Sequence, residues 1–255
     1  MKYVLSIAGS DSSGGAGIQA DIKTITCLGA HALTVVTAVT AQNSCGITAI
    51  QRVSAKVISK QIEAIFDDVK PHGVKVGMLL TGGAIRAVAR MIKRYKVSGI
   101  VVDPVLKAST GKGLLEPGAV SLLKEVLLPL AGVVTPNLDE ASILTGHPVK
   151  NVRTMKEASK RIKDLGPDVI ITGGHLKNRS VDLMYDGRMF YQFSGPRIKT
   201  RHTHGTGCVF STALATYLAM DHDLEKAAGL SHDFTRQAIE KGYACGKGAG
   251  PVNPG

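Results

Sequence analysis

The sequence predicts an α/β protein of one domain, residues 1–255, with a largely parallel central sheet, helices on both faces and a small antiparallel hairpin. Short β-rich runs alternate with segments of helical periodicity along most of the chain. The runs at 99–104 and 168–174 are almost wholly apolar, as expected of strands buried on both faces. With 255 residues, 44% of them hydrophobic, the chain can bury a full core.

The first half of the chain alternates strands and helices. We expect strands at 3–9, 32–39, 47–53 and 73–78, and helices at 15–29, 54–69 and 81–95. The first helix has isoleucines and a leucine at helical spacing and reaches Gly29, which is a natural C-terminal stop. Ser54 is a favourable N-cap for the second helix.

The second half continues the alternation and then changes. We expect strands at 99–104, 132–136 and 168–174, and helices at 116–128, 137–146 and 153–166. Residues 181–195 then predict an antiparallel hairpin that turns at Asp186-Gly187. Two helices, at 207–220 and 223–242, close the chain.

Composition excludes several classes of function. The net charge of +11 attracts anions, but the basic residues are dispersed and aromatic residues make up only 4%, so we expect no nucleic-acid partner. No apolar run approaches a membrane span and the N-terminus is not a signal peptide, so we expect a cytoplasmic protein without membrane contact. Neither the four cysteines, which form no C-x-x-C pair, nor the His-Thr-His run at 202–204 with His175 predicts a metal site.

Polar residues follow the expected strands. In open α/β sheets, ligands bind beyond the carboxyl ends of the strands. We therefore expect these polar segments to converge on one rim, which makes them site candidates together: Gly-Ser-Asp-Ser-Ser-Gly-Gly-Ala-Gly, Ala-Gln-Asn-Ser-Cys-Gly, Gly-Met-Leu, Asp-Pro-Val-Leu-Lys, Thr-Pro-Asn-Leu-Asp-Glu and Thr-Gly-Gly-His.

The run Gly205-Thr206-Gly207-Cys208 stands where a loop meets an alanine-rich helix. A glycine-lined turn at a helix N-terminus presents free N–H groups to an anion, and the helix dipole adds to the attraction. Such amides can stabilise the charge that develops in phosphoryl transfer. We also expect the helix end to lower the pKa of the Cys208 thiol. The alternative is a buried cysteine at an ordinary loop–helix junction.

Residues 9–21 contain a second glycine-rich loop between a strand and a helix. It has neither the Walker A pattern nor the dinucleotide spacing, and residues 109–113 fail as a Walker A loop too. The loop at 9–21 is therefore expected to let a substrate approach the backbone. Asp21 either points its carboxylate at a polar ligand or is a solvated acid in the first turn of the helix.

Acidic and amide side chains lie just past other strands. Asp103, Asn137 and Glu140 are placed where a phosphate-binding rim holds Mg²⁺, although singly they would be turn and cap residues. Gln42 and Asn43 carry amides that both donate and accept, as recognition of a heteroaromatic edge requires.

The motifs taken together resemble the hydroxymethylpyrimidine/phosphomethylpyrimidine kinases of thiamine synthesis, in the ribokinase superfamily. The resemblance extends over essentially the whole chain, in the same motif order, and includes residues 6–24, 37–47, 74–79, 101–105, 135–146, 173–176, 203–208 and 246–254. It implies a three-layer ribokinase-like fold, a homodimer, and ATP with Mg²⁺. It also implies two phosphorylations, first of 4-amino-5-hydroxymethyl-2-methylpyrimidine and then of its monophosphate.

The resemblance also implies residue roles. Gln42 matches the pyrimidine-binding glutamine, and Asp21 resembles the acid beside the ring. The implied pocket walls are Ala16, Met78 and Val105. The implied metal and nucleotide residues are Asp103 and Glu140, with Asn137, Thr172 and Thr203, and the implied anion hole is Gly205 to Cys208.

Two positions depart from the family pattern. The family usually has lysine where this chain has Thr172, and it tends to have lysine at Ser109, which Lys107 and Lys112 flank here. Many relatives in the superfamily have a catalytic aspartate at the position of Cys208. A phosphate acceptor is largely ionised, with a second pKa of about 6, so it needs no strong base and a carboxylate would repel it. Rival interpretations are a pyridoxal kinase, a sugar kinase, and a regulatory protein that has lost phosphoryl transfer.

Overall fold

The computed structural model describes residues 1–108, 111, 113–174 and 179–255. Its strands are β1 (Tyr3–Asp11), β2 (His31–Asn43), β3 (Gly46–Arg52), β4 (Gly73–Val76), β5 (Val101–Val102), β6 (Val133–Val134), β7 (Asp168–Thr172), β8 (Arg179–Tyr185) and β9 (Phe190–Pro196). Its α-helices are α1 (Gly17–Cys27), α2 (Ala55–Phe66), α3 (Gly82–Tyr95), α4 (Ala119–Leu122), α5 (Leu138–Thr145), α6 (Val152–Lys163), α7 (Thr206–Ala219) and α8 (Leu224–Glu240).

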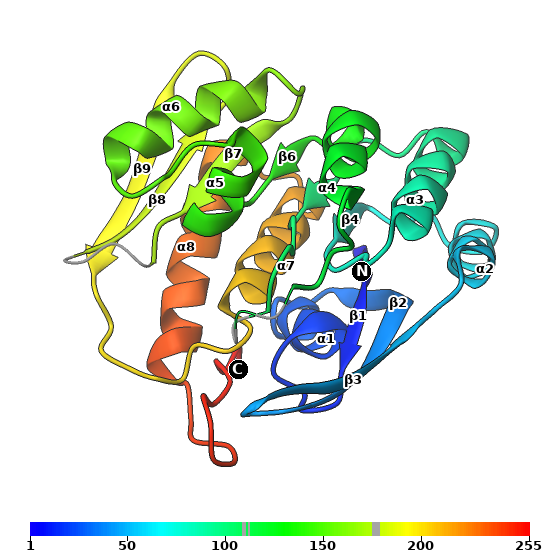
Figure 1. The fold of residues 1–255 in the computed structure, drawn as a ribbon, viewed down its shortest axis with the longest axis horizontal. Helices are drawn as coiled ribbons and strands as arrows, with labels where there is room; N and C mark the ends of the chain where they lie inside the picture. The colour runs from blue at the N-terminus through cyan, green and yellow to red at the C-terminus, as the bar shows by residue number, and fades with distance from the viewer. Residues whose placement is uncertain (109–110, 112, 175–178) are drawn as a thin grey trace.

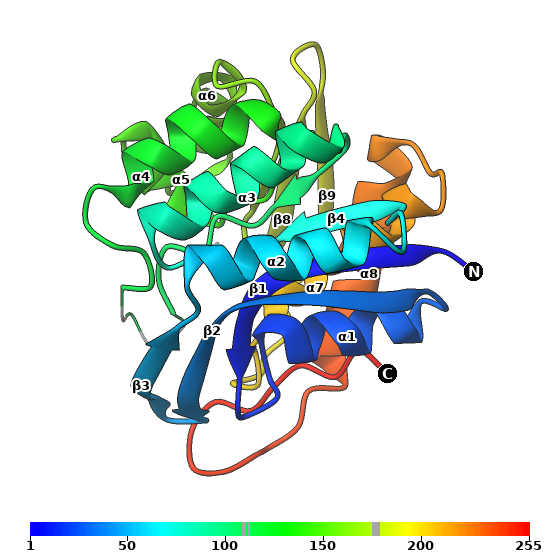
Figure 2. The same cartoon turned by 90° about the vertical axis from the view of Figure 1, so that its right-hand side faces the viewer.

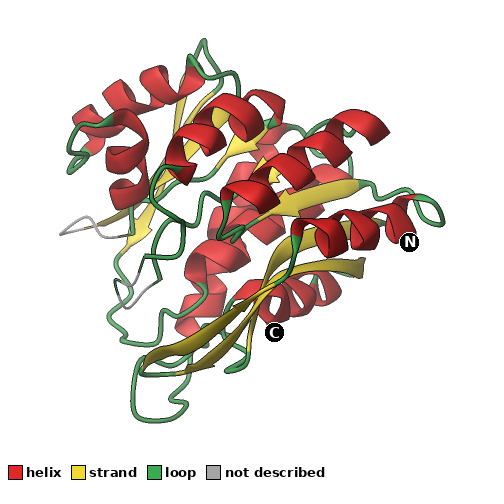
Figure 3. Cartoon of the chain, turned by 45° about the vertical axis from the view of Figure 1, so that its right-hand side comes forward, coloured by secondary structure: helices red, strands yellow, loops and turns green. Residues whose placement is uncertain are grey.

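Among the described residues the strands form one nine-stranded sheet in the order β3-β2-β1-β4-β5-β6-β7-β8-β9. The strands from β2 to β7 in that order are parallel, whereas β3 at one edge and the β8–β9 hairpin at the other are antiparallel. Helices α2 to α6 cover one face and α1, α7 and α8 cover the other (Figures 1, 2 and 3). The predicted three-layer α/β fold with a largely parallel sheet is confirmed.

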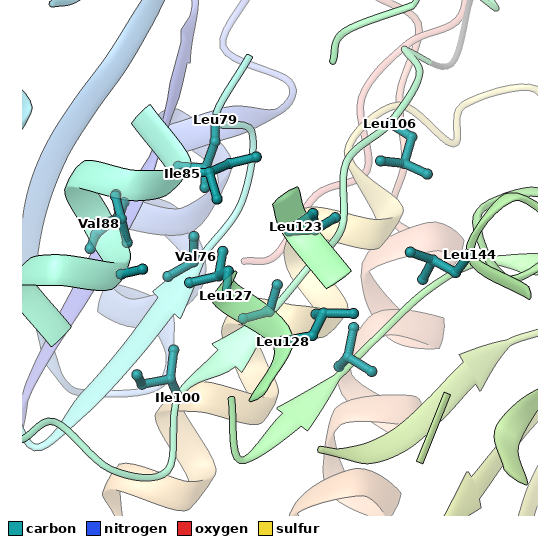
Figure 4. Close-up of a cluster of buried hydrophobic side chains, with 14 of the residues drawn as sticks. Val76, Leu79, Ile85, Val88, Ile100, Leu106, Leu123, Leu127, Leu128 and Leu144 are labelled. Atoms are coloured by element: carbon teal, nitrogen blue, oxygen red, sulfur yellow. The ribbon is translucent and has the colours of Figure 1, made fainter. Parts of the chain in front are cut away.

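The core has an apolar layer on each side of the sheet. Figure 4 shows the larger one, where Val76 from β4, Ile85 and Val88 from α3, and Leu123 and Leu127 lie close together. Each large aliphatic side chain that is fully buried in this way contributes about 1.5–3 kcal/mol. None of the described helices is both long and apolar enough to cross a membrane.

Several element ends match the sequence expectations. The Ser54 side chain caps α2 by accepting from the Val57 amide at 3.3 Å. Gly29 follows α1 with a φ of +78°, as expected of a C-terminal stop. The hairpin turns at Asp186 and Gly187, with a φ of +96° at the glycine.

Several element boundaries differ from the prediction. Strand β2 continues to Asn43, because beyond the end of β1 it still pairs with β3, and this places Gln42 within a strand instead of a loop. The helix expected at 116–128 is a short α4, a π turn (Leu123–Leu127) and a 3₁₀ turn (Leu128–Leu130). Strands β5 and β6 hold only two residues each. Although β5 and β6 are short, they run parallel to their neighbours, so their carboxyl ends lie at the same edge of the sheet and the position of the rim is unchanged.

Candidate active site

Two glycine loops from opposite ends of the chain meet at the carboxyl ends of the strands. We call residues 12–16 the N-terminal glycine loop and residues 203–207 the C-terminal glycine loop. Gly205 has a φ of +87°, and a Cβ there would overlap the carbonyl oxygen of Gly15. Only glycine permits both this backbone conformation and this approach. The structure thus brings together two glycine loops that the sequence analysis treated separately.

The C-terminal segment, residues 250–253, holds the C-terminal glycine loop from behind. The His204 amide donates to the Gly250 carbonyl at 3.2 Å, and the Val252 amide donates to the His204 carbonyl at 3.1 Å. The Asn253 amide donates to Ala238 of α8 at 2.9 Å. The loop is therefore anchored to α8 as well as to α7.

Helix α7 begins directly at this loop. Gly205 is its N-cap and carries no capping side chain, and the Val209 amide is the first to bond back, to the Gly205 carbonyl at 2.9 Å. The amide and hydroxyl of Thr206 both donate to the Thr203 carbonyl, at 3.3 and 2.7 Å. The amides of Gly207 and Cys208 belong to the first turn, which has no acceptors within the helix. This geometry suits an anion.

Cys208 differs from the expectation in its pKa. Burial raises the pKa of the thiol to about 12, although the Lys75 ammonium and the Gly17 amide act to lower it. The prediction that the helix end lowers this pKa is therefore wrong, because desolvation of the thiolate outweighs the helix end. At neutral pH the side chain is an uncharged thiol, half-buried against Ala20 and Val209.

Asp21 is fully buried and contacts the second turn of α7. One carboxylate oxygen accepts from Thr212 Oγ1 of α7 at 2.7 Å, and the other accepts from Ser6 Oγ of β1. Lys75 Nζ of β4 donates to both oxygens, at 3.0 and 2.9 Å. The alternative of a solvated acid is wrong. Both oxygens are engaged by the protein, so a role beside a substrate ring stays a prediction.

Asp103 and Glu140, the acidic pair, lie at the ends of β5 and at the start of α5, and both are buried. Burial, reinforced by the Asp103 carboxylate, raises the pKa of Glu140 to about 8. Burial also raises the pKa of Asp103, whose Oδ2 accepts from Ser211 Oγ at 3.0 Å. The Asp103 carboxylate disfavours ionisation of Glu140, and the two buried carboxylates form an oxygen donor set that fits a hard divalent cation.

Asn137 joins the acidic pair to β7. Its Oδ1 accepts from the Glu140 amide, and Glu140 Oε2 accepts from the Asn137 amide, both at 2.9 Å, so the two form a capping box. Asn137 also pairs in a β-bridge with Thr172, whose amide donates to the Pro136 carbonyl at 2.9 Å. The structure thus brings Asp103, Asn137, Glu140 and Thr172 to one side of the rim.

Apolar side chains line the other side. Met78 and Val105 pack in one cluster with Ala38, Leu80 and Leu114. Ala16 is the N-cap of α1, and its Cα lies 3.6 Å from the position that a Cβ on Gly205 would take. The predicted wall residues therefore belong to the same end of the sheet as the two glycine loops.

Gln42 belongs to a polar chain that sequence reasoning missed. Its Nε2 lies 3.2 Å from His204 Nε2, which lies 2.9 Å from Asp11 Oδ2. Burial acts to raise the pKa of Asp11, but hydrogen bonds from His204 and Ser13 hold it below its usual value. The Asp-Ser-Ser sequence before the glycines signals the turn at Asp11, whereas His204 carried no signal beyond its place in the His-Thr-His run.

The structure assigns no role to several positions that the sequence analysis named. Lys107 is exposed, in a bridge with Gly113. Ser109, Lys112 and His175 lie outside the described residues. Which lysine replaces the ones absent at Thr172 and Ser109 therefore stays a prediction.

Comparison with known proteins places this geometry among vitamin kinases. The phosphomethylpyrimidine kinase family model matches residues 11–253. The hydroxymethylpyrimidine/phosphomethylpyrimidine kinase of Bacillus subtilis is 42% identical over 98% of this chain and 93% of its own length. The thiamine biosynthesis bifunctional protein ThiED of Geobacter sulfurreducens is 46% identical over 98% of this chain, which spans only 51% of that protein. An ADP complex of Bacillus subtilis pyridoxal kinase has a TM-score of 0.93 and 37% identity, over 99% of this chain and 97% of that one.

Proposed function

This chain belongs to the phosphomethylpyrimidine kinase family, and from that premise we propose that it phosphorylates 4-amino-5-hydroxymethyl-2-methylpyrimidine and then its monophosphate, with ATP as donor, in thiamine biosynthesis. The relatives at 42–46% identity carry the names of thiamine-pathway proteins, which supports this substrate. The ADP complex of a structural neighbour at 37% identity supports an adenine nucleotide as the donor.

The proposal rests on the place where three parts meet. The first turn of α7, the N-terminal glycine loop and the acidic pair open on the same rim. We assign the amides of Gly207 and Cys208, in the first turn of α7, to the transferred phosphoryl group, where fixed donors stabilise the charge of a loose transition state. Gly207 is exposed and has no side chain, so a phosphate can approach its amide closely.

The acidic pair is proposed to hold Mg²⁺, directly or through water. Bound there, the ion would neutralise negative charge on the nucleotide phosphates. The capping box keeps the Glu140 carboxylate oriented, and Ser211 does the same for Asp103. Thr172 and Thr203 are proposed to contact the nucleotide from the two sides of the acidic pair, together with Asn137.

The pyrimidine is proposed to pair with Gln42, whose amide offers one donor and one acceptor to a ring nitrogen and the 4-amino group. Met78 and Val105 supply apolar contact to the ring. Cys208 lies at the start of α7 as an uncharged thiol, so it adds no negative charge where the acceptor enters. Because phosphoryl transfer through a loose transition state asks little of a base, a thiol suffices there.

Pyridoxal is the second candidate acceptor, because a pyridoxal kinase matches the fold with a TM-score of 0.93. A homodimer and a cytoplasmic location complete the proposal. Gel filtration with light scattering tests the first, and cell fractionation tests the second.

The deciding experiment measures ATP consumption with Mg²⁺ for the free pyrimidine, its monophosphate and pyridoxal. We expect diphosphate formation from the monophosphate. Turnover with pyridoxal alone would move the assignment to vitamin B6 salvage, and no turnover with any acceptor would refute a kinase. Gln42→Leu should raise KM for the pyrimidine and leave KM for ATP unchanged, whereas Gln51→Leu, an exposed glutamine on the same hairpin, should change neither.

A further inference from the structure

The side-chain amide of Gln42 belongs to a hydrogen-bond chain in which the place of each hydrogen can be worked out. His204 Nε2 lies 2.9 Å from Asp11 Oδ2 and 3.2 Å from the amide of Gln42. On its other side, the same amide lies 3.2 Å from Thr40 Oγ1. A ring nitrogen and a hydroxyl each carry one hydrogen at most, so few arrangements satisfy the whole chain.

Asp11 determines whether His204 Nε2 carries a hydrogen. Its Oδ1 accepts from the amide and the hydroxyl of Ser13, at 2.8 and 2.7 Å, and its Oδ2 accepts from the Ala16 amide at 2.9 Å. With donors at both oxygens, the carboxylate acts only as an acceptor. His204 Nε2 therefore carries a hydrogen and donates it to Asp11, because a lone pair at Nε2 would face a negative oxygen.

The ring of His204 is held in place by its neighbours. A Cβ on Gly15 would overlap His204 Cδ2 and would lie 3.2 Å from Pro251 Cβ, so the ring fills the space that the glycine leaves. The side chains of His204 and Asp11 are only 13% and 4% exposed, which leaves little access for water to replace either partner. The Nε2 hydrogen thus has a fixed place beside Gln42.

The direction of the Gln42 amide follows from that hydrogen. Rotation by 180° about the Cγ–Cδ bond exchanges the amide oxygen and nitrogen, and their partners decide between the two directions. With the nitrogen toward His204, two N–H groups would face each other at 3.2 Å. With the oxygen toward His204, it shares the Nε2 hydrogen, and the amide nitrogen can donate to Thr40 Oγ1, which itself donates to the Ser10 carbonyl at 3.0 Å. Only the second direction gives every group a compatible partner.

This direction determines how an aminopyrimidine lies against Gln42. The ring nitrogen accepts a hydrogen bond and the neighbouring 4-amino group donates one. The ring nitrogen therefore pairs on the Thr40 side, and the amino group pairs on the His204 side. The 5-hydroxymethyl group is next to the amino group on the ring, so it lies on the side of the C-terminal glycine loop, where the phosphoryl group is expected. The opposite amide direction would turn the ring over and move the hydroxyl away.

We propose that Asp11 and His204 are positioning residues that fix the direction of the Gln42 amide, so that a paired aminopyrimidine turns its 5-hydroxymethyl group toward the C-terminal glycine loop. This inference deepens the proposed function and rests on it, because it takes Gln42 to bind the ring. It assigns the choice between an aminopyrimidine and its 4-oxo counterpart to two residues that act through Gln42.

The test compares 4-amino-5-hydroxymethyl-2-methylpyrimidine with its 4-oxo counterpart, in which the ring nitrogen donates and the 4-substituent accepts. The wild-type protein can pair the 4-oxo compound only in the turned-over position. Calorimetry without ATP should give affinities within about tenfold of each other, because two hydrogen bonds form in either case. With ATP and Mg²⁺, kcat for the 4-oxo compound should be lower by about a hundredfold or more, since its hydroxyl is misplaced.

Asp11→Asn should change these two kcat values in opposite directions. Its amide nitrogen can donate to His204 Nε2, which then presents a lone pair, and the Gln42 amide reverses. We expect kcat to rise for the 4-oxo compound and to fall for the amino compound, so that their ratio drops below about tenfold. His204→Phe removes the hydrogen and allows both directions, so it should also lower the ratio if Asp11→Asn disturbs the N-terminal glycine loop.

The matched controls remove the same chemical groups elsewhere. Asp186→Asn changes a carboxylate that accepts from the Arg188 and Met189 amides in the β8–β9 turn. His72→Phe removes a ring whose Nδ1 accepts from the Tyr3 amide at 3.1 Å, at the amino end of the strands. Both controls should leave the ratio unchanged.

An equal loss of turnover with both acceptors, or an unchanged ratio in Asp11→Asn and His204→Phe, would overturn the proposal while leaving the kinase assignment intact. A wild-type protein that phosphorylates neither compound would refute the proposed function, and the inference with it.

Discussion

The buried pair of Lys75 and Asp21 should couple strongly in folding stability. Coulomb's law at 2.9 Å and an effective dielectric near 20 gives about 6 kcal/mol for two unit charges. Removing one partner leaves the other charge buried and unpaired, which costs about 3–5 kcal/mol. We therefore expect Lys75→Met and Asp21→Asn each to lose about 4 kcal/mol of unfolding free energy. The double variant should lose only about 2 kcal/mol, because the Asn amide leaves one buried hydrogen-bond partner of Asp21 unsatisfied.

Urea unfolding at pH 7, followed by circular dichroism, closes this double-mutant cycle. The two single losses exceed the loss of the double variant by about 6 kcal/mol in total, and this difference is the coupling energy of the pair. It matches the Coulomb energy, since the double variant has no buried charge left. The half-exposed pair of Lys163 and Asp168 is the control, and its coupling should stay below about 1 kcal/mol. If the single losses of Lys75 and Asp21 simply add, the two groups do not form a buried ion pair and the reasoning fails.

Three further predictions concern the site. Gly205→Ala should lose about 2–3 kcal/mol of stability in thermal melts and most ATP turnover, because φ is +87° and the new Cβ would overlap Gly15. The control Gly29→Ala, at φ +78° with open space around the new Cβ, should lose about 1 kcal/mol and keep activity. Burial raises the pKa of Glu140 to about 8, so the folded state holds a proton that the unfolded state releases near pH 4.5. The free energy of unfolding should therefore fall as the pH rises from 5 to 8, by on the order of 4 kcal/mol at most. Urea unfolding without Mg²⁺ at several pH values measures this fall. Glu140→Gln should flatten that profile, and an unchanged slope would contradict the assignment. Cys208→Asp should slow phosphorylation of the monophosphate more than that of the free pyrimidine in product assays, and equal losses would sink the idea.

The fold and the rim could be predicted from the sequence because both follow from local patterns. Strand–helix alternation fixes a parallel sheet, and a parallel sheet gathers the residues after its strands. Asp103 and Glu140 could therefore be placed together although 37 residues separate them. The capping box of Asn137 and Glu140 follows equally from their spacing.

Burial and distant pairing could not be predicted in the same way. In the sequence Lys75 is an ordinary polar position in a short strand, and its partner Asp21 is 54 residues away. The helix end predicted the wrong direction for the Cys208 pKa, because the sequence supplies the dipole but not the loss of water. Gln42 was expected in a loop, because the hairpin that extends β2 past β1 depends on pairing with β3.

The meeting of the two glycine loops has a consequence for synthesis of the chain. Asp11 and His204 are 193 residues apart, and the segment that holds His204 in place reaches Asn253. Domains fold from the N-terminal side as the chain leaves the ribosome, so the sheet can form while this segment is still inside the exit tunnel. The proposed phosphate-binding floor then closes last. A nascent chain would hold its apolar core long before it could bind a nucleotide, and no catalytically competent fragment should appear during translation.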